Sequence, residues 1–231
     1  MNTTMSHKIQ AVLFDLDGTL VDTAADFIRI IQLMCIKYNH NCPTDEEIRS
    51  QVSAGARAMV KLMFGEELAK VSDEDSKLLA YRQGFLDLYE ADICVDSRLF
   101  DGFDELLTTL ENQGIPWGIV TNKPRYLAQQ LLSELNLHTR CSVLVCPDDV
   151  KNTKPDPEPM LLASQKLGIA SQNCLYIGDH VRDIMAGNAA NMQTVAVKFG
   201  YIVPGETIED WGADYVIDTP KELSEFILSQ I

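Results

Sequence analysis

The chain has 231 residues, of which 46% are hydrophobic and 23% are charged, the balance of an ordinary globular protein. Its 34 acidic and 19 basic residues give a formal net charge of −15, so we expect no nucleic-acid partner and no anionic membrane partner. Neither a signal-peptide pattern nor a bilayer-spanning apolar stretch is found. Six cysteines without a Cys-x-x-Cys pair are typical of reduced thiols, which favours a cytoplasmic location. No sequence pattern indicates an oligomeric state.

The first predicted element is a short strand that leads into a polar turn. Residues Ile9–Phe14 are mostly apolar, and the sequence DLDGTLVD follows them directly. A short apolar run that stops at a polar turn is typical of a buried strand. Asp15 is therefore expected at the carboxyl end of the first strand.

A long helical segment follows, from Thr23 to about Asp96, in which no strand is predicted. Apolar residues recur there at helical spacing. Thr44 and Glu47 have the spacing of a capping box, which marks the start of one of the helices.

This segment predicts a second domain inserted into the first. We expect an all-α domain at residues 21–96 and an α/β core made of residues 1–20 and 97–231. The two connections between them, near residues 21–22 and 97–102, would be the hinges of a lid.

The rest of the chain alternates between short apolar runs and leucine-rich helical patterns. Apolar runs that predict strands occur at 117–121, 142–146, 174–177, 194–197 and 215–217. Helical patterns occur before and between them at 106–110, 127–135, 161–167 and 181–190. This alternation is typical of a doubly wound α/β fold with a parallel sheet, which binds ligands at the carboxyl ends of its strands.

Four aspartates are expected at that edge of the sheet. Asp15 and Asp179 each end a predicted strand, and Asp17 lies in the turn after the first. Asp183 lies one helical turn beyond Asp179. Two like charges about 4 Å apart repel by about 4 kcal/mol at an effective dielectric constant near 20. The cluster therefore predicts a divalent cation, and oxygen ligands without histidine favour Mg²⁺.

Groups that bind an anion are expected beside these aspartates. Thr121 ends a second predicted strand and Asn122 follows it, and Lys154 lies in a polar turn before a proline-rich segment. The turn at residues 16–18 offers backbone N–H groups that can hold an anion. Together these groups predict a phosphate site. Beside a phosphoryl group, one carboxylate can act as a nucleophile and a second as a general acid and base.

Four motifs, in this order and spacing, resemble those of the haloacid dehalogenase-like phosphohydrolase superfamily over nearly the whole chain. They are DLDGT, the strand-end Thr121, Lys154-Pro155 and GDHVRD. The resemblance implies that Asp15 is the nucleophile and that Asp17 is the general acid and base. It also implies that Thr121 and Lys154 hold the phosphoryl group, together with Asn122.

The same resemblance implies a metal site. Asp15, the backbone carbonyl of Asp17 and Asp179 would bind Mg²⁺, and Asp183 would support them. The function implied is the magnesium-dependent hydrolysis of a small-molecule phosphomonoester through an aspartyl-phosphate intermediate.

The helical insertion resembles the helical cap of the phosphoglycolate phosphatases. Several segments are also similar to the bacterial N-acetylmuramic acid 6-phosphate phosphatases of cell-wall sugar recycling: VTNKP, CPDDVKNTKPDPEP, SAGARAMV, RLFDG, GYI and WGADYVID. This similarity implies N-acetylmuramic acid 6-phosphate as the substrate, with phosphoglycolate as the alternative.

Two other functions would use the same residues. A phosphosugar mutase would also need Asp15 and Asp17, but Thr19 stands where β-phosphoglucomutases typically have valine, which favours hydrolysis. A non-catalytic phosphate-binding module is disfavoured because every candidate catalytic group is present.

One loop of the predicted cap is a candidate for substrate selection. Residues Ser53 to Arg57 form a joint between two predicted helices, and Gly55 lies at its centre. Arg57 either reaches into the crevice and binds a substrate carboxylate or pairs with an acid on the surface. His180, in the fourth motif, either touches the substrate or begins a helix in solvent.

Overall fold

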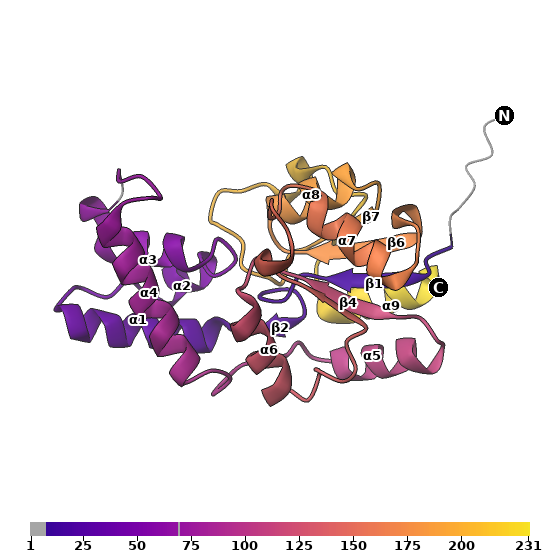
Figure 1. The fold of residues 1–231 in the computed structure, drawn as a ribbon, viewed down its shortest axis with the longest axis horizontal. Helices are drawn as coiled ribbons and strands as arrows, with labels where there is room; N and C mark the ends of the chain where they lie inside the picture. The colour runs from indigo at the N-terminus through magenta and orange to yellow at the C-terminus, as the bar shows by residue number, and fades with distance from the viewer. Residues whose placement is uncertain (1–7, 69) are drawn as a thin grey trace.

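The computed structural model describes residues 8–68 and 70–231. These residues form an α/β core with a group of helices beside it (Figure 1). Within the described ranges, no helix combines the length and the apolar character needed to cross a bilayer. The first seven residues, where the sequence has no signal-peptide pattern, lie outside the described residues.

A six-stranded parallel sheet forms the centre of the core. Its strands are β1 (Ala11–Phe14), β4 (Trp117–Val120), β5 (Val143–Val145), β6 (Cys174–Gly178), β7 (Gln193–Val197) and β8 (Tyr215–Ile217). Their order in the sheet is β5-β4-β1-β6-β7-β8, and every neighbouring pair is parallel. The doubly wound α/β fold predicted from the sequence is therefore confirmed. The strand order reverses beside β1, which is where such sheets bind ligands.

Helices cover both faces of this sheet. They are α5 (Phe103–Asn112), α6 (Arg125–Glu134), α7 (Glu158–Leu167), α8 (Val181–Ala189) and α9 (Pro220–Gln230). Val12 and Phe14 of β1 pack in the same apolar cluster as α5 and α9, whereas Leu13 packs in the cluster of α7 and α8. Because both faces are covered, the whole strand has to be apolar. Helix α9 was not expected from the sequence, although the Thr219 hydroxyl caps its first turn.

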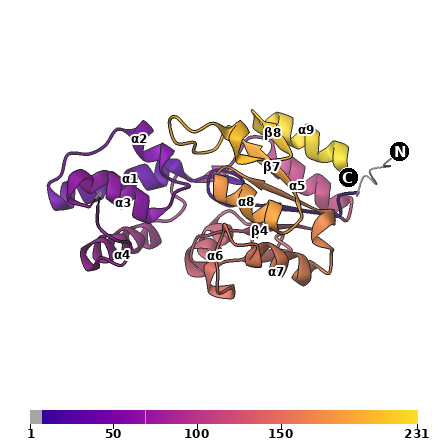
Figure 2. The ribbon, with the colours of Figure 1, turned by 90° about the horizontal axis from the view of Figure 1, so that it is seen from above.

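Within residues 23–68 and 70–96, the inserted segment forms four α-helices, which we call the cap helices, and one short 3-10 helix at Gly65–Glu67. The cap helices are α1 (Ala24–Tyr38), α2 (Asp45–Ser50), α3 (Ala56–Phe64) and α4 (Ser76–Ala91). Figures 1 and 2 show them together at one end of the molecule, beside the sheet. The predicted capping box is confirmed, since Thr44 Oγ1 accepts a hydrogen bond from the Glu47 N–H at 3.2 Å and the Glu47 carboxylate accepts one from the Thr44 N–H at 2.8 Å.

Two short strands connect the cap helices to the core. They are β2 (Val21–Asp22) and β3 (Arg98–Leu99), which pair antiparallel. The buried carboxylate of Asp26, in the first turn of α1, accepts hydrogen bonds from the Ser97 N–H at 3.0 Å and the Ser97 hydroxyl at 2.5 Å. The two connections are therefore bonded to each other where the chain enters and leaves the cap helices.

Candidate active site

The polar residues expected at the sheet edge lie where three strands end. Asp15 follows β1, Thr121 follows β4 and Asp179 follows β6. Because β1 lies between β4 and β6 in a parallel sheet, these residues meet at one edge. Asp183 joins them from the first turn of α8.

Three of the aspartates form a buried group, which we call the carboxylate cluster: Asp15, Asp179 and Asp183. One carboxylate oxygen from each lies within 4.8 Å of the other two. The residues are 4%, 1% and 0% exposed. Lys154 places its Nζ 2.9 Å from Asp15 Oδ1 and 2.6 Å from Asp183 Oδ1. Three carboxyl groups therefore share one buried ammonium group, which cannot balance all of them when they are ionised.

Lys154 is a buried cation and not a solvated surface lysine. Its Nζ donates to the carbonyl oxygen of Val120 at 2.9 Å and lies 3.0 Å from the hydroxyl of Tyr176. Burial lowers the pKa of Lys154, but Asp15 and Asp183 raise it further, so that the pKa lies above its ordinary value. The side chain therefore keeps its charge next to the carboxylate cluster.

The members of the carboxylate cluster repel one another. Burial, followed by the charges of Asp15 and Asp183, raises the pKa of Asp179 to about 7. Burial also raises the pKa of Asp15, although the charge of Lys154 opposes this shift. A divalent cation among the carboxylates would balance the residual charge, and oxygen ligands suit a hard cation. The residues present therefore fit a divalent metal ion.

Two glycines allow the backbone to approach Asp179 closely. A Cβ atom at Gly18 would lie 2.1 Å from Asp179 Oδ2, and one at Gly200 would lie 2.2 Å from Asp179 Cβ. Gly18 also has a φ of +82°, which favours glycine. Asp179 Oδ2 accepts hydrogen bonds from the Tyr201 N–H at 2.8 Å and from the Ser53 hydroxyl at 2.6 Å. The carboxylate is therefore held in position from several sides.

The side chain of Asp17 makes contacts of its own, outside the carboxylate cluster. Its Oδ1 accepts hydrogen bonds from Lys123 Nζ at 3.0 Å and from Thr23 Oγ1 at 2.8 Å. Lys123 is buried, and its Nζ also lies 3.0 Å from the hydroxyl of Tyr89 on α4. The ion pair between Asp17 and Lys123 therefore touches a cap helix.

The prediction that the turn at residues 16–18 offers free N–H groups is wrong for two of its three residues. The Leu16 N–H donates to Asp15 Oδ1 at 2.8 Å, and the Gly18 N–H donates to the carbonyl of Val21 at 2.9 Å. The turn is buried, and buried N–H groups are stable only when they are paired. These two N–H groups are therefore used within the turn and are not available to bind an anion.

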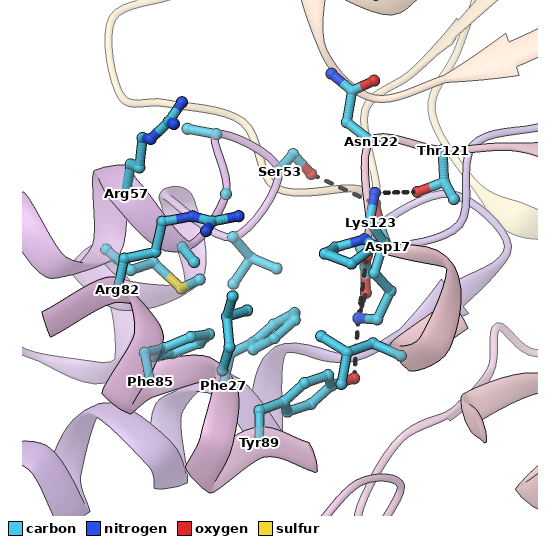
Figure 3. Close-up of a pocket in the computed structure, with 18 of the residues that line it drawn as sticks. Asp17, Phe27, Ser53, Arg57, Arg82, Phe85, Tyr89, Thr121, Asn122 and Lys123 are labelled. Carbon is cyan, nitrogen blue, oxygen red and sulfur yellow. Dashed lines mark hydrogen bonds and ion pairs between the residues drawn. The ribbon is translucent and has the colours of Figure 1, made fainter. Parts of the chain in front are cut away.

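The two residues after β4 have different contacts, although both line the same cavity (Figure 3). The buried hydroxyl of Thr121 accepts a hydrogen bond from the Lys123 N–H at 3.1 Å. The side-chain amide of Asn122 donates to the carbonyl oxygen of Lys154 at 3.1 Å. Asn122 thus holds the loop that carries Lys154.

This cavity has a volume of about 310 Å³ and lies between the sheet edge and the cap helices. Asp15, Asp17 and Thr121 line it from the core, while Arg57 and Arg82 line it from α3 and α4. Apolar side chains make up much of the wall between them: Phe27, Val52, Met59, Phe85, Leu86 and Leu127. The wall therefore combines apolar side chains with polar and charged groups, which suits a polar small molecule.

The loop between α2 and α3 brings the cap to the carboxylate cluster. The Ser53 hydroxyl bonds to Asp179, and the Ser53 carbonyl accepts a hydrogen bond from the guanidinium of Arg182. Gly55 has a φ of +92° and begins α3. Arg57 is an exposed residue in the first turn of α3 and lines the cavity. Ser53 therefore touches the core, whereas Arg57 stays on the cap side.

His180 begins α8, as one of the two interpretations of the sequence predicts. Its Nδ1 accepts a hydrogen bond from the Arg182 N–H at 3.2 Å, which caps the helix. The residue is half-buried rather than free in solvent, and burial lowers its pKa to about 4.

Four residues of the site had no functional role in the sequence-based predictions: Lys123, Arg182, Tyr201 and Arg82. Arg182 lies in the motif GDHVRD, Lys123 lies in the segment VTNKP two residues after Thr121, and Tyr201 lies in GYI. Their positions in these segments were the available signal. Arg82 lies in the middle of α4 and far from every motif along the chain, so no local pattern marks it.

Comparison with known proteins agrees with this geometry. The model of the haloacid dehalogenase-like hydrolase family matches residues 12–197. The N-acetylmuramic acid 6-phosphate phosphatase of Pseudomonas aeruginosa is 45% identical over 220 residues, which cover 95% of each chain. A phosphoglycolate phosphatase of Xanthomonas campestris is 40% identical over 216 residues, or 94% of this chain and 95% of that one. The crystal structure of a hydrolase from Pseudomonas syringae has a TM-score of 0.71 at 26% identity, and covers 96% of this chain and 98% of its own.

Proposed function

Because the chain belongs to the haloacid dehalogenase-like hydrolase family, we propose that it hydrolyses a small phosphomonoester through a phosphorylated Asp15. The main support for this proposal is the position of Asp15. It lines the cavity, is bonded to the buried Lys154, and lies in the carboxylate cluster. A group whose pKa is shifted by burial and by specific charged neighbours, in a cavity, is a strong candidate for catalysis. The phosphatase names of the similar proteins support the reaction type.

We propose Mg²⁺ as the metal, held by Asp15, Asp179 and the backbone carbonyl of Asp17, with Asp183 in support. The Ser53 hydroxyl supports this set, because it lies 2.6 Å from Asp179 Oδ2 and 3.4 Å from the carbonyl oxygen of Asp17, which brings two of the proposed ligands near one point. The bound ion would supply positive charge to the phosphoryl oxygens.

In the first proposed step, a carboxylate oxygen of Asp15 forms a bond to phosphorus while the bond from phosphorus to the alcohol oxygen of the substrate breaks. Asp17 gives its proton to the departing oxygen. Thr121 and Lys154 hold the phosphoryl oxygens. The contact between Asp17 and Lys123 has to open before Asp17 can reach the departing oxygen.

In the second proposed step, Asp17 takes a proton from a water molecule, whose oxygen forms a bond to phosphorus. The bond between phosphorus and the Asp15 oxygen breaks, so inorganic phosphate is released and the Asp15 carboxylate is restored. Asp17 ends the cycle protonated, as it began. The net reaction is hydrolysis of the ester by one water molecule.

We propose N-acetylmuramic acid 6-phosphate as the substrate, which the 45% identity to the Pseudomonas aeruginosa enzyme supports. Phosphoglycolate is the second candidate, supported by the 40% identity to the Xanthomonas enzyme. Both substrates present the same phosphoryl group to the core, so we propose that residues 21–96 form a cap domain that selects between them, over a core of residues 1–20 and 97–231. The loop with Ser53, Gly55 and Arg57 lies at the cavity and is placed to take part in this selection.

We also propose that the enzyme acts in the cytoplasm. All six cysteines are free in the structure, which describes each of them. Free thiols are typical of a reducing compartment.

Release of inorganic phosphate in the presence of Mg²⁺ tests the proposed function. We expect the highest kcat/KM with N-acetylmuramic acid 6-phosphate, and lower values with phosphoglycolate and p-nitrophenyl phosphate. Asp15→Asn keeps the shape of the side chain but cannot form the aspartyl-phosphate, so kcat should fall about a thousandfold or more with no change in the folded state.

Asp148→Asn is the matched control, because Asp148 instead bonds to the N–H of Arg125 at 3.0 Å and does not line the cavity. This variant should keep wild-type activity. Substantial turnover by Asp15→Asn, in a preparation free of contaminating phosphatases, would show that Asp15 is not the nucleophile.

A further inference from the structure

Two arginines of the cap helices line the wall of the cavity. Arg57 comes from α3 and Arg82 from α4, and both line the cavity that Asp15 lines from the core. In Figure 3 the guanidinium of Arg82 points into the cavity, and Asp17 and Thr121 lie on the opposite side. The cavity therefore has cationic groups at the end remote from the proposed phosphoryl site.

Among the described residues, neither arginine lies within 4.0 Å of a carboxylate. This is unexpected in a chain with 34 acidic and only 19 basic residues. Arg29, Arg125 and Arg140, by contrast, each form an ion pair. The charge of Arg57 acts on the exposed Asp73 and helps to lower its pKa, but within the described residues it forms no ion pair. Both guanidinium groups can therefore still bind an anion from the cavity.

The environment of Arg82 costs energy as long as no anion is bound. Arg82 is half-buried, and burial together with the charge of Arg57 lowers its pKa below the ordinary value. An anion between the two guanidinium groups would offset both effects. A guanidinium binds a carboxylate with two parallel hydrogen bonds, so this pair suits a carboxylate well.

We propose that Arg57 and Arg82 form a subsite for a carboxylate of the substrate, and that the enzyme acts on phosphomonoesters whose carboxylate is separated from phosphorus by a bulky body. This inference rests on the proposed phosphatase function. The apolar side chains between the two ends of the cavity, such as Phe27, Phe85 and Met59, would pack against that body.

The separation of the two ends distinguishes the two candidate substrates. In phosphoglycolate a single carbon joins the ester oxygen to the carboxylate, so both charges would lie at the same end of the cavity. In N-acetylmuramic acid 6-phosphate a sugar ring separates the phosphate from the lactyl carboxylate. The arginine pair on the far wall therefore favours the sugar phosphate.

N-acetylglucosamine 6-phosphate provides a matched test, because it differs from N-acetylmuramic acid 6-phosphate only in lacking the lactyl group. The readout is the ratio of kcat/KM for the two substrates, measured with inorganic phosphate release. We expect wild-type enzyme to prefer the muramic acid substrate. Arg82→Gln should lower that ratio by about 30-fold or more, the size expected when a partner of a desolvated charge pair is removed. Arg57 is exposed, so Arg57→Gln should lower the ratio by a smaller factor.

Lys77→Gln is the control, since it makes the same change of charge on α4 but removes an ion pair with Glu67 outside the cavity. Its ratio should equal that of the wild type. Thermal unfolding of each variant confirms that it is folded.

The outcomes separate this inference from the proposed function. Wild-type enzyme that hydrolyses neither sugar phosphate, nor p-nitrophenyl phosphate, in the presence of Mg²⁺ contradicts the proposed function itself. Active wild-type enzyme whose substrate ratio is unchanged in both arginine variants overturns the carboxylate subsite alone. An equal fall for both substrates also overturns it, because the arginines would then act on a part that the two substrates share.

Discussion

We expect the metal-free protein to lose stability as the pH rises from 5 to 8, because Asp179 then has to ionise inside the carboxylate cluster. Burial and the charges of Asp15 and Asp183 raise its pKa from 3.8 to about 7 in the folded state. A carboxyl group with a raised pKa binds its proton more tightly in the folded state than in the unfolded state. The stability that this proton contributes is fully present below pH 3.8 and is lost as the pH rises through about 7.

The size of the loss follows from the two pKa values of Asp179. One pKa unit corresponds to about 1.4 kcal/mol, so the shift from 3.8 to about 7 is worth about 4 kcal/mol once the group is ionised in both states. About 3 kcal/mol of this loss falls between pH 5 and pH 8. The residue is 1% exposed, so screening by solvent reduces the effect little.

Urea unfolding in EDTA, at several pH values from 5 to 8, measures this loss. Over this interval the free energy of unfolding of the wild-type protein should fall by about 3 kcal/mol more than that of Asp179→Asn, in which the side chain does not ionise. Excess Mg²⁺ should remove most of the difference for the wild type, because the cation compensates the charge. Asp148→Asn, outside the cluster, should behave as the wild type. Equal slopes for wild type and Asp179→Asn would refute the reasoning about the cluster.

Three other perturbations test the site. EDTA should abolish phosphate release, and added Mg²⁺ should restore it. Added Ca²⁺ should restore little activity, because its longer and looser coordination would misplace Asp15. Full activity in excess EDTA would contradict the metal site. Asp17→Asn should lower kcat more for a sugar phosphate than for p-nitrophenyl phosphate, whose leaving group scarcely needs a proton, and equal losses would argue against the role of Asp17 as general acid. Gly18→Ala should lower the free energy of unfolding by about 1–3 kcal/mol and should also lower the activity, because the new Cβ would lie 2.1 Å from Asp179 Oδ2. Gly205→Ala is the control: the residue has a φ of +92°, but no atom lies within 4 Å of the new Cβ. This variant should lose only the stability that the backbone strain costs and should stay active.

The core of the fold could be predicted because its signals are local. A strand covered on both faces has to be apolar along its whole length, so β1 is visible as the run that ends at Phe14. Parallel strands bring their carboxyl ends to one edge, so Asp15, Thr121 and Asp179 could be placed together from the order of strands and turns alone. The four motifs added the roles that these residues are proposed to have.

The contacts of the site were decided by tertiary packing. Lys123 pairs with Asp17, Ser53 reaches Asp179 across 126 positions of the chain, and Arg82 enters the cavity from the middle of a cap helix. None of these contacts follows from spacing along the chain. The first depends on how the turns after β1 and β4 face each other, and the other two depend on where the cap helices pack against the edge of the sheet. The sequence by itself determined which chemical groups end the strands of the core. The packing of the cap on that core decided which atoms face one another across the cavity.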